Sequence, residues 1–265
     1  MDESLRTRID ELMRAGASRH EVAAELEAEV LRREQAVRAT FRRYVSPHVA
    51  DRILDGRLPD TVLEVCDTRT HAVVMFADLR GFCGLSERLP PQEVVPLLNA
   101  YFALLHEISF RYDGTVFHMA GDGLMLGFGV PLPQPSSTVR AVLAAREMLE
   151  RFGRLAAVWR ERYGIEAGLG IGINEGDVVA GNIGSAAYMS YTIIGDTVNI
   201  AARLCQRARS GELLFSKAVK ESLDGAQVDV QATALPPMQL RGRLNPIELY
   251  CVPVASRMQT SLADA

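Results

Sequence analysis

Two apolar segments that each lead into an aspartate constrain the fold of this sequence most. Residues 73–78 read Val-Val-Met-Phe-Ala-Asp, and residues 115–122 read Thr-Val-Phe-His-Met-Ala-Gly-Asp. Such runs are typical of core strands, and the glycines beside them allow the backbone to approach a ligand closely. Two carboxylates at strand ends, Asp78 and Asp122, suit two hard divalent cations that also bind a polyphosphate. The pair predicts a metal site, although a single aspartate of this kind often only caps a turn.

The composition indicates one main domain with an extension. The chain has 265 residues, of which 48% are hydrophobic, enough for one core of ordinary size. Its net charge of -4 offers no general attraction to nucleic acid or to an anionic membrane. Without a signal-peptide core or an apolar run near the roughly 20 residues that span a bilayer, we expect a cytoplasmic protein with no direct membrane insertion. Free thiols are expected because no CxxC spacing joins the cysteines, Cys66, Cys83, Cys205 and Cys251.

Residues 1–60 are predicted to form a helical regulatory or dimerisation region, since they are rich in Glu, Arg, Ala and Leu. Ser18 and Glu21 form a capping-box signal for the start of a helix. Apolar residues then recur at spacing seven, at Ala23, Val30, Val37 and Tyr44. A dimerising coiled coil and simple packing on the following domain both fit, because Arg33 and Thr40 interrupt the second apolar stripe.

A nucleic-acid partner is not expected for this region. Residues 15–23 weakly resemble a helix-turn-helix, but arginines and acidic residues nearly balance over residues 1–60. A DNA-reading module would present a basic footprint, which this balance does not provide. We therefore expect residues 1–60 to act through a regulatory protein partner or through dimerisation.

Beyond Pro59 the sequence changes character, and a domain boundary is expected near residue 60. The order strand, helix, hairpin, helix, strand predicts an α+β fold with a ferredoxin-like, antiparallel-rich sheet and helices on one face. The catalytic domain is expected over residues 61–254, followed by a tail over 255–265. The expected strands are 62–66, 71–77, 115–119, 124–128, 166–173, 177–183, 212–215, 238–241 and 247–252. The expected helices after residue 45 are 46–56, 91–110, 137–163 and 196–208.

Two further segments carry residues suited to a nucleotide. After Asp78 the chain enters a helical stretch, so free backbone amides there suit phosphate oxygens. The segment consists of Leu79, Arg80, Gly81, Phe82 and Cys83. Farther on, Asn199 and Arg203 stand four apart on one predicted helix face after Gly195, where an amide and a guanidinium suit a ribose and a phosphate. An ordinary tight turn and a solvated polar stripe are the alternatives that geometry alone leaves open.

Taken together, these segments resemble the catalytic domain of the class III nucleotidyl cyclases, of the bacterial type. The resemblance extends in order over about residues 65–254. The matching segments are Phe-Ala-Asp-Leu-Arg-Gly-Phe (76–82), Ala-Gly-Asp-Gly-Leu-Met (120–125), Gly-Ile-Gly-Ile-Asn-Glu-Gly-Asp-Val-Val-Ala-Gly-Asn-Ile-Gly (170–184), Tyr-Thr-Ile-Ile-Gly-Asp-Thr-Val-Asn-Ile-Ala-Ala-Arg-Leu (191–204) and Leu-Arg-Gly-Arg-Leu-Asn-Pro-Ile-Glu-Leu-Tyr (240–250).

The resemblance implies a catalytic role for several of these positions. Asp78 and Asp122 match the metal-binding aspartates, with Leu79 beside them, and each site would hold two divalent cations, Mg²⁺ or Mn²⁺. Asn199 matches the asparagine that orients the ribose, and Arg203 matches the arginine that stabilises the transition state. Such cyclases act as head-to-tail dimers with interfacial sites, so a homodimer of this chain would carry two equivalent sites.

The resemblance also implies which residues contact the base and the terminal phosphates. His118 stands where adenylate cyclases usually carry a base-reading lysine, and Thr192 stands at the second base-reading position. Arg241 and Arg243 both lie in the region from which a basic residue reaches the terminal phosphates, and the sequence does not decide between them. His118 in place of lysine, like Cys83 in place of a hydroxyl residue, departs from the family pattern.

The expected activity is the conversion of ATP to 3′,5′-cyclic AMP and pyrophosphate. ATP is favoured over GTP because no carboxylate, the acceptor that a strict guanine site requires, stands at position 118. A guanylate cyclase is the first alternative, and a non-catalytic nucleotide-sensing or dimerisation module is the second. A cyclic dinucleotide synthase is not expected because the sequence has no GGDEF-like run.

Overall fold

The computed structural model describes residues 14, 16–41, 68–185, 188–240 and 245–253 of the chain. The chain divides into two compact units, residues 1–45 and 46–265. Several sequence-based expectations lie outside the described residues: the helix expected over 46–56, the strand over 62–66, the domain boundary near 60, the tail over 255–265, and Arg241 with Arg243.

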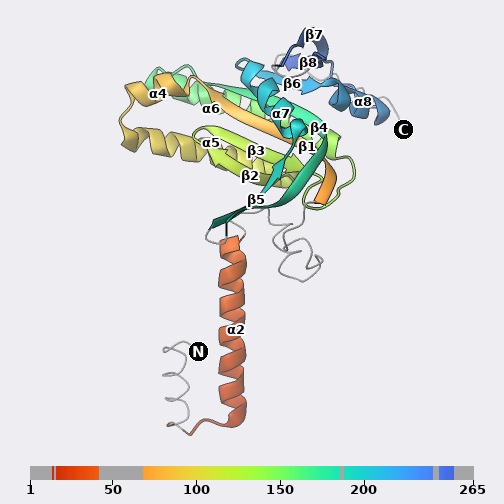
Figure 1. The fold of residues 1–265 in the computed structure, drawn as a ribbon. Helices are drawn as coiled ribbons and strands as arrows, with labels where there is room; N and C mark the ends of the chain where they lie inside the picture. The colour runs from red at the N-terminus through yellow and green to blue at the C-terminus, as the bar shows by residue number, and fades with distance from the viewer. Residues whose placement is uncertain (1–13, 15, 42–67, 186–187, 241–244, 254–265) are drawn as a thin grey trace, which may run out of the picture. The chain divides into compact units, whose positions relative to one another are not determined.

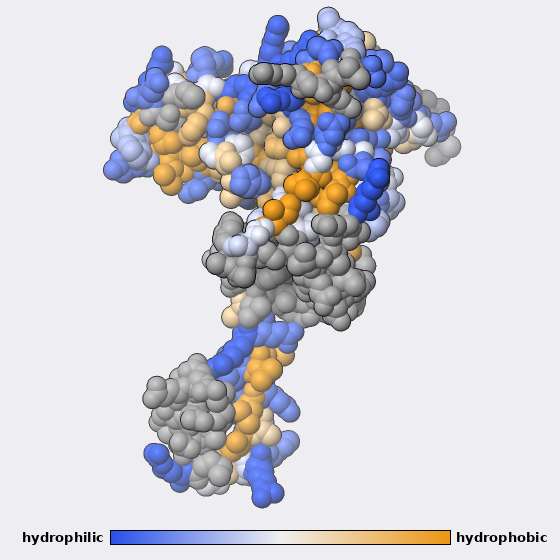
Figure 2. Space-filling view, viewed as in Figure 1, coloured by the Kyte–Doolittle hydropathy of each residue, from blue (hydrophilic) through white to orange (hydrophobic). Residues whose placement is uncertain are grey.

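The described part of the first unit is a long helix, α2 (Arg19–Phe41). The capping box is confirmed, because the Ser18 amide donates to Glu21 Oε2 at 2.7 Å and the Glu21 amide donates to Ser18 Oγ at 3.3 Å. Figure 2 shows apolar surface along α2, on which Val30 and Leu31 are 64% and 57% exposed. Both sequence-based interpretations of this helix, coiled coil and packing surface, therefore stay predictions.

The second unit is built on an eight-stranded sheet, ordered β2-β3-β1-β4-β6-β8-β7, with β5 paired to β4 (Figure 1). Among the described residues, all strand pairs are antiparallel except β4 with β6. The fold class is thus confirmed as α+β with an antiparallel-rich sheet. The strands are β1 (Thr68–Arg80), β2 (Thr115–Ala120), β3 (Gly123–Phe128), β4 (Gly168–Ser185), β5 (Tyr188–Ile194), β6 (Glu212–Ser216), β7 (Thr233–Met238) and β8 (Ile247–Pro253).

Helices pack on both faces of this sheet, which corrects the expectation that they lie on one face. Residues 73, 75, 77 and 79 of β1 join α5 (Pro91–Arg111), α6 (Ser137–Tyr163) and α8 (Lys217–Gly225) in the main core. The alternate residues 72 and 74 lie in a second core with Ala201 of α7 (Asp196–Arg207). Because successive strand residues point to opposite faces, α7 covers the face opposite α5 and α6.

The close packing of α7 depends on a glycine in β4. A Cβ atom placed on Gly172 would lie 2.1 Å from the Cys205 amide nitrogen and 2.6 Å from the Ala201 carbonyl oxygen. Backbone thus lies directly against backbone, and any side chain at position 172 would displace the helix. The sequence motif around Gly172 therefore has a packing role in addition to its place in the family pattern.

The long helices and the β2–β3 hairpin lie where the sequence predicts them, but other elements differ. β4 is one continuous strand where two strands, 166–173 and 177–183, were expected, and the polar side chains of Asn174 and Glu175 between them are buried. Sequence reasoning missed β5 and α8. The strand before β8 was expected at 238–241, but β7 covers Thr233–Met238. Pro236 and Pro237 disfavour a strand, and β7 tolerates them because it lies at the end of the sheet order, beside β8. None of the described helices combines the length and hydrophobicity of a bilayer crossing.

Candidate active site

The two predicted metal-binding aspartates come together near the end of β1, beside the start of β3. Asp78, near the end of β1, lies directly opposite Gly123, the first residue of β3. Asp122 immediately precedes Gly123 in the turn of the β2–β3 hairpin. The buried Tyr101 hydroxyl of α5 donates to the Asp122 carbonyl oxygen at 3.1 Å and so anchors this turn to the core. Both aspartate side chains are half-buried.

The two carboxylates influence each other electrostatically. Burial and the charge of Asp78 raise the pKa of Asp122, because both disfavour its ionised form. The described residues contain no cluster of three or more His, Cys, Asp or Glu side chains around a common point. Two hard carboxylates that repel each other fit a divalent cation of the Mg²⁺ or Mn²⁺ type, whose other oxygen ligands come from backbone, substrate or water.

The segment that follows Asp78 differs in one respect from the expectation of a phosphate-binding turn. Gly81 has a positive φ of 87°, and α4 begins at Phe82 (Phe82–Arg88), as a turn into a helix requires. The Leu79 side chain is buried in the core. The Arg80 guanidinium, however, points back into the protein and contacts Asp78 and α7. Any phosphate contact from residues 79–82 would therefore come from the backbone; the Cys83 side chain lies outside the described residues.

Asn199 and Arg203 lie together on the exposed side of α7, four residues apart, as predicted. Arg203 donates to Gln206 Oε1 at 2.8 Å. Cys205, on the opposite side of the helix, is buried and meets Arg80. Because Arg80 holds Asp78 at that buried side, the structure does not direct Asn199 and Arg203 toward the aspartates of the same chain.

The two predicted base-reading residues lie on β2 and β5, two strands that are not paired with each other in the sheet order. His118 is exposed on β2, and Thr192 is half-buried on β5. Phe117 and Tyr191, the residues before them, stack with ring centroids 6.0 Å apart. A bulge at Phe117 lets His118 pair with Met125, whose side chain lies in the core cluster under α7. His118 therefore lies on the same sheet face as Asp78.

A family model for the adenylate and guanylate cyclase catalytic domain matches residues 65–254, which include both aspartates, α7 and the two predicted base-reading positions. The chain belongs to this cyclase family. The predicted family resemblance is therefore confirmed, over the same residues.

Solved cyclase domains of both nucleotide specificities resemble this cyclase domain. An adenylyl cyclase, CyaB from P. aeruginosa, is 30% identical and superposes with a TM-score of 0.68 over 74% of this chain and 98% of that chain. A guanylyl cyclase, Cya2, is 32% identical, with a TM-score of 0.64 over 70% of this chain and 93% of that chain. These likenesses support the cyclase fold and do not distinguish ATP from GTP.

Curated relatives of the cyclase domain are longer proteins. An uncharacterized protein of Mycobacterium tuberculosis is 33% identical over 223 residues, which cover 83% of this chain but 38% of that protein. A second uncharacterized protein from the same organism is 35% identical over 182 residues, 68% of this chain and 31% of its own length. The chain thus spans well under half the length of these two relatives.

Two residues near the candidate site were not predicted to lie there. Tyr101 falls within the expected helix 91–110, and Cys205 was expected only as a free thiol, yet they contact the Asp122 turn and Arg80 respectively. No spacing in the sequence signals either contact, because both join segments that are far apart in the chain.

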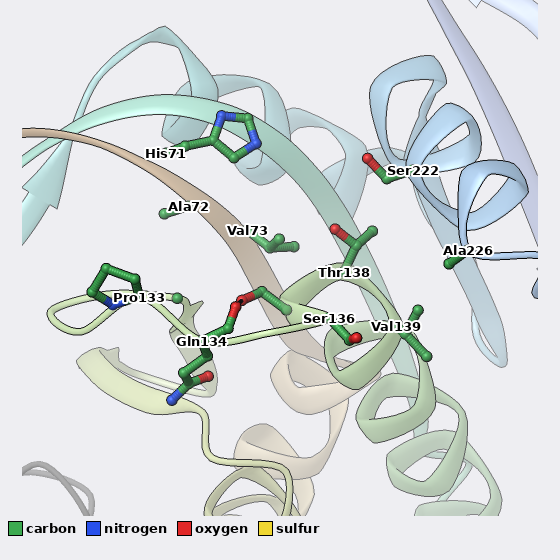
Figure 3. A pocket seen from close by; sticks show the side chains of 12 residues that line it. His71, Ala72, Val73, Pro133, Gln134, Ser136, Thr138, Val139, Ser222 and Ala226 are labelled. Carbon is green, nitrogen blue, oxygen red and sulfur yellow. Dashed lines mark hydrogen bonds between the residues drawn. The ribbon is translucent and has the colours of Figure 1, made fainter.

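A separate pocket of about 380 Å³ lies near the start of β1 (Figure 3), and neither Asp78 nor Asp122 lines it. His71, Thr138 and Ser222 are among its lining residues. The Thr138 and Ser222 hydroxyls both donate to the buried Glu175 carboxylate, with Thr138 Oγ1 at 2.5 Å from Glu175 Oε2. Thr138 and Ser222 therefore connect α6 and α8 to Glu175 of β4, and none of the predicted site residues lines the pocket.

Proposed function

We propose that this chain is an adenylate cyclase that converts ATP to 3′,5′-cyclic AMP and pyrophosphate. The ribose 3′-oxygen attacks the α-phosphorus in line with the departing pyrophosphate. The observation that carries the proposal is the pairing of Asp78 with Gly123, which brings Asp122 close enough for the Asp78 charge to raise its pKa. Paired carboxylates at a strand edge, within a matched cyclase domain, suit the binding of a metal-complexed triphosphate.

Asp78 and Asp122 would hold two divalent cations, Mg²⁺ or Mn²⁺, with the Leu79 carbonyl as a further ligand. When bound, such cations favour ionisation of the 3′-hydroxyl and neutralise charge on the leaving group. The backbone amides of residues 79–83 would bind phosphate oxygens, and either Arg241 or Arg243 would contact the terminal phosphates. Most of the catalytic effect would then come from positioning and electrostatic stabilisation.

We assign the ribose and the transition-state charge to Asn199 and Arg203 of a second copy of the chain. Their exposed side of α7 faces away from the buried side that contacts Arg80, so one chain does not direct both sets of residues to one site. A head-to-tail homodimer resolves this, since each chain gives its aspartates to one site and its α7 to the other. Two equivalent sites would result.

Adenine recognition is assigned to His118 and Thr192. Both side chains can donate or accept a hydrogen bond, which suits the N1 acceptor and N6 donor of adenine without excluding guanine. We therefore propose a modest preference for ATP over GTP. Residues 1–60 would set how the two catalytic domains meet, as a regulatory or dimerising element.

The decisive experiment is an assay of the purified chain with ATP and with GTP, each with Mg²⁺ and with Mn²⁺. Formation of cyclic AMP at a higher kcat/KM than cyclic GMP supports the proposal. Efficient turnover of GTP with little turnover of ATP would instead identify a guanylate cyclase. A folded, dimeric protein that binds but does not cyclise either nucleotide would identify a non-catalytic sensing module.

A further inference from the structure

Arg80 makes an unusually complete set of contacts for an arginine next to a predicted metal ligand. Its Nη1 donates to Asp78 Oδ2, its Nη2 to the Cys205 carbonyl oxygen, and its Nε to the Ala208 carbonyl oxygen at 3.0 Å. Both carbonyls belong to the last turn and the C-cap of α7. Carbonyl oxygens at a helix C-terminus carry partial negative charge and favour a cation, so these contacts fix the position of the guanidinium.

Gly170 provides the space in which the Arg80 guanidinium lies. A Cβ atom on Gly170 would stand 2.6 Å from Arg80 Nη2 and 2.9 Å from both Cζ and Nε. The Gly170 carbonyl in turn accepts the Cys205 thiol at 3.4 Å, which ties β4 to α7 at the same point. Any side chain at position 170 would therefore displace the guanidinium from this position without replacing Arg80.

Only one oxygen of Asp78 is used by Arg80. Oδ2 accepts the guanidinium, whereas Oδ1 lies on the side of Gly123, 3.7 Å from the position of a Cβ on that residue. Gly123 is the residue next to Asp122. The contact with Arg80 thus fixes the rotation of the Asp78 carboxylate. Its other oxygen, Oδ1, is directed toward the start of β3, next to Asp122.

We propose that Arg80 is a positioning residue for the predicted metal site, and that it connects this site to α7. Its guanidinium orients the Asp78 carboxylate and at the same time binds the C-terminal turn of the helix whose exposed side carries Asn199 and Arg203. This inference rests on the proposed function for the roles of those residues. In the proposed homodimer, Asp78 of one chain belongs to one active site, and Asn199 and Arg203 of the same chain belong to the other. Arg80 therefore connects the metal-binding residues of one site to the ribose- and phosphate-binding helix of the other.

A competing interpretation is that Arg80 only occupies the place of a cation at Asp78. In that case, metal binding would have to expel the guanidinium. Two carbonyl oxygens at the end of α7 accept hydrogen bonds from Arg80 independently of Asp78, and the Arg80 side chain is only 24% exposed. Expelling the guanidinium would therefore cost free energy, because these two partly buried hydrogen bonds would be lost. The two interpretations predict opposite effects of removing the guanidinium on metal affinity.

The test measures Mn²⁺ binding to the full chain by the loss of the free-ion electron paramagnetic resonance signal, without nucleotide. Arg80→Met removes the guanidinium but keeps much of the apolar stem, Arg80→Lys keeps the charge without the fork, and Gly170→Ala displaces the guanidinium from its position. Asp78→Asn shows how much of the signal belongs to the site. Arg69→Met is the matched control, because Arg69 pairs with Asp177 at the other end of the same strand.

We expect Arg80→Met and Gly170→Ala each to weaken Mn²⁺ binding by about 10- to 100-fold, the usual effect of losing a residue that orients a metal ligand. Arg80→Lys should lie between them and the unaltered chain, and Arg69→Met should bind normally. The Arg80→Met/Gly170→Ala double variant should bind Mn²⁺ about as weakly as either single variant, because both changes remove the guanidinium from the same position. Unchanged or tighter Mn²⁺ binding in folded Arg80→Met and Gly170→Ala proteins would overturn the proposal.

Circular dichroism and melting in EDTA separate positioning from folding. If Arg80→Met does not fold, Arg80→Lys and Gly170→Ala decide the matter. A lower melting temperature with unchanged Mn²⁺ affinity would show that Arg80 merely stabilises α7, against the proposal. Because the binding measurement needs no turnover, an unaltered chain that binds Mn²⁺ but cyclises no nucleotide would count against the proposed function alone.

Discussion

Phe117 of β2 stacks on Tyr191 of β5, with ring centroids 6.0 Å apart and ring planes 27° from parallel. The stack joins two strands that are not neighbours in the sheet order. His118 and Thr192 are the next residues along these strands, so the stack sets the separation of the two proposed base-reading positions. Offset aromatic pairs of this kind add about 0.5–1.5 kcal/mol beyond their buried area.

The first prediction concerns base selection at His118. His118→Lys should raise the ratio of ATP to GTP turnover, because lysine only donates hydrogen bonds and adenine N1 accepts one. His118→Glu should shift turnover toward GTP, since guanine presents an N1–H donor. We expect changes of about 10-fold in the ratio of kcat/KM values, typical for one hydrogen bond. His71→Lys, at an exposed histidine near the start of β1, is the control. Equal ATP-to-GTP ratios in the unaltered chain and in all three variants would refute these assignments.

Asp78→Asn and Asp122→Asn should each lower turnover by at least about 100-fold, because loss of a direct ligand exceeds the usual effect of losing a supporting residue. Cyclic nucleotide formation, followed by chromatography, measures this. Near-normal rates in either folded variant would exclude the two-aspartate site.

Asp122→Asn should raise the melting temperature of the metal-free protein at neutral pH. Burial and Asp78 raise the pKa of Asp122, so its ionised form is less favourable in the folded than in the unfolded protein. This carboxyl group therefore supports stability below its unfolded pKa and ceases to do so as the pH rises through the raised folded pKa. Melting in EDTA at pH 4 and pH 7 checks the sign: the advantage of the variant should appear only at the higher pH.

Mixing two inactive variants should restore activity if the sites are shared. A heterodimer of Asp78→Ala and Arg203→Ala chains retains one complete site, so a fully exchanged mixture should recover about a quarter of the normal activity. Differently tagged chains, copurified to demonstrate heterodimers, provide the measurement. Asp78→Ala mixed with Asp122→Ala is the control, because both changes affect the same half of a site. Inactivity of proven Asp78→Ala/Arg203→Ala heterodimers would indicate sites within one chain.

Removing residues 1–60 should change the dimerisation constant and the specific activity together. The described helix α2 exposes Val30 and Leu31, which suits a contact with another helical surface. Analytical ultracentrifugation and cyclase assays of the full chain and of residues 61–265 give both quantities. Exchange of Val30 and Leu31 for Gln in the full chain separates this surface from the effect of truncation. Identical values for all three proteins would leave residues 1–60 without a regulatory role.

The Cys205 thiol should make the folded protein sensitive to alkaline pH. Burial, above all, raises the pKa of Cys205 to about 12, against a normal value of 9.0. Above pH 9 the thiol ionises in the unfolded chain but not in the folded one, so stability falls by up to about 1.4 kcal/mol per pH unit toward pH 12. Urea unfolding at pH 8 and pH 10.5 should show a smaller loss for Cys205→Ala than for the unaltered chain. Tyr101, whose pKa is raised above all by burial, should lower stability at alkaline pH in both proteins.

Sequence patterns determined much of the architecture because the relevant interactions are local. The spacing of apolar residues along α5 and α6 is enough to predict these helices. The glycines beside Asp122 similarly predict the turn before β3 from a few consecutive residues. Ser18 and Glu21 similarly define the start of α2. The elements that escaped prediction have weaker local signals. α8 is short, and its two buried residues, Val219 and Leu223, become apolar contacts only when they pack on the main core.

The sequence by itself also identified the family, and it singled out Asp78, Asp122, Asn199 and Arg203 as candidate site residues, since motif and helical spacing are linear properties. Only the tertiary structure decided how they are arranged. It set Asp78 against Gly123, turned the Arg80 guanidinium from solvent to the end of α7, and left Asn199 and Arg203 on the outer side of that helix. These relations depend on strand register and on helix packing against β4, which bring together residues from distant segments that no local pattern connects.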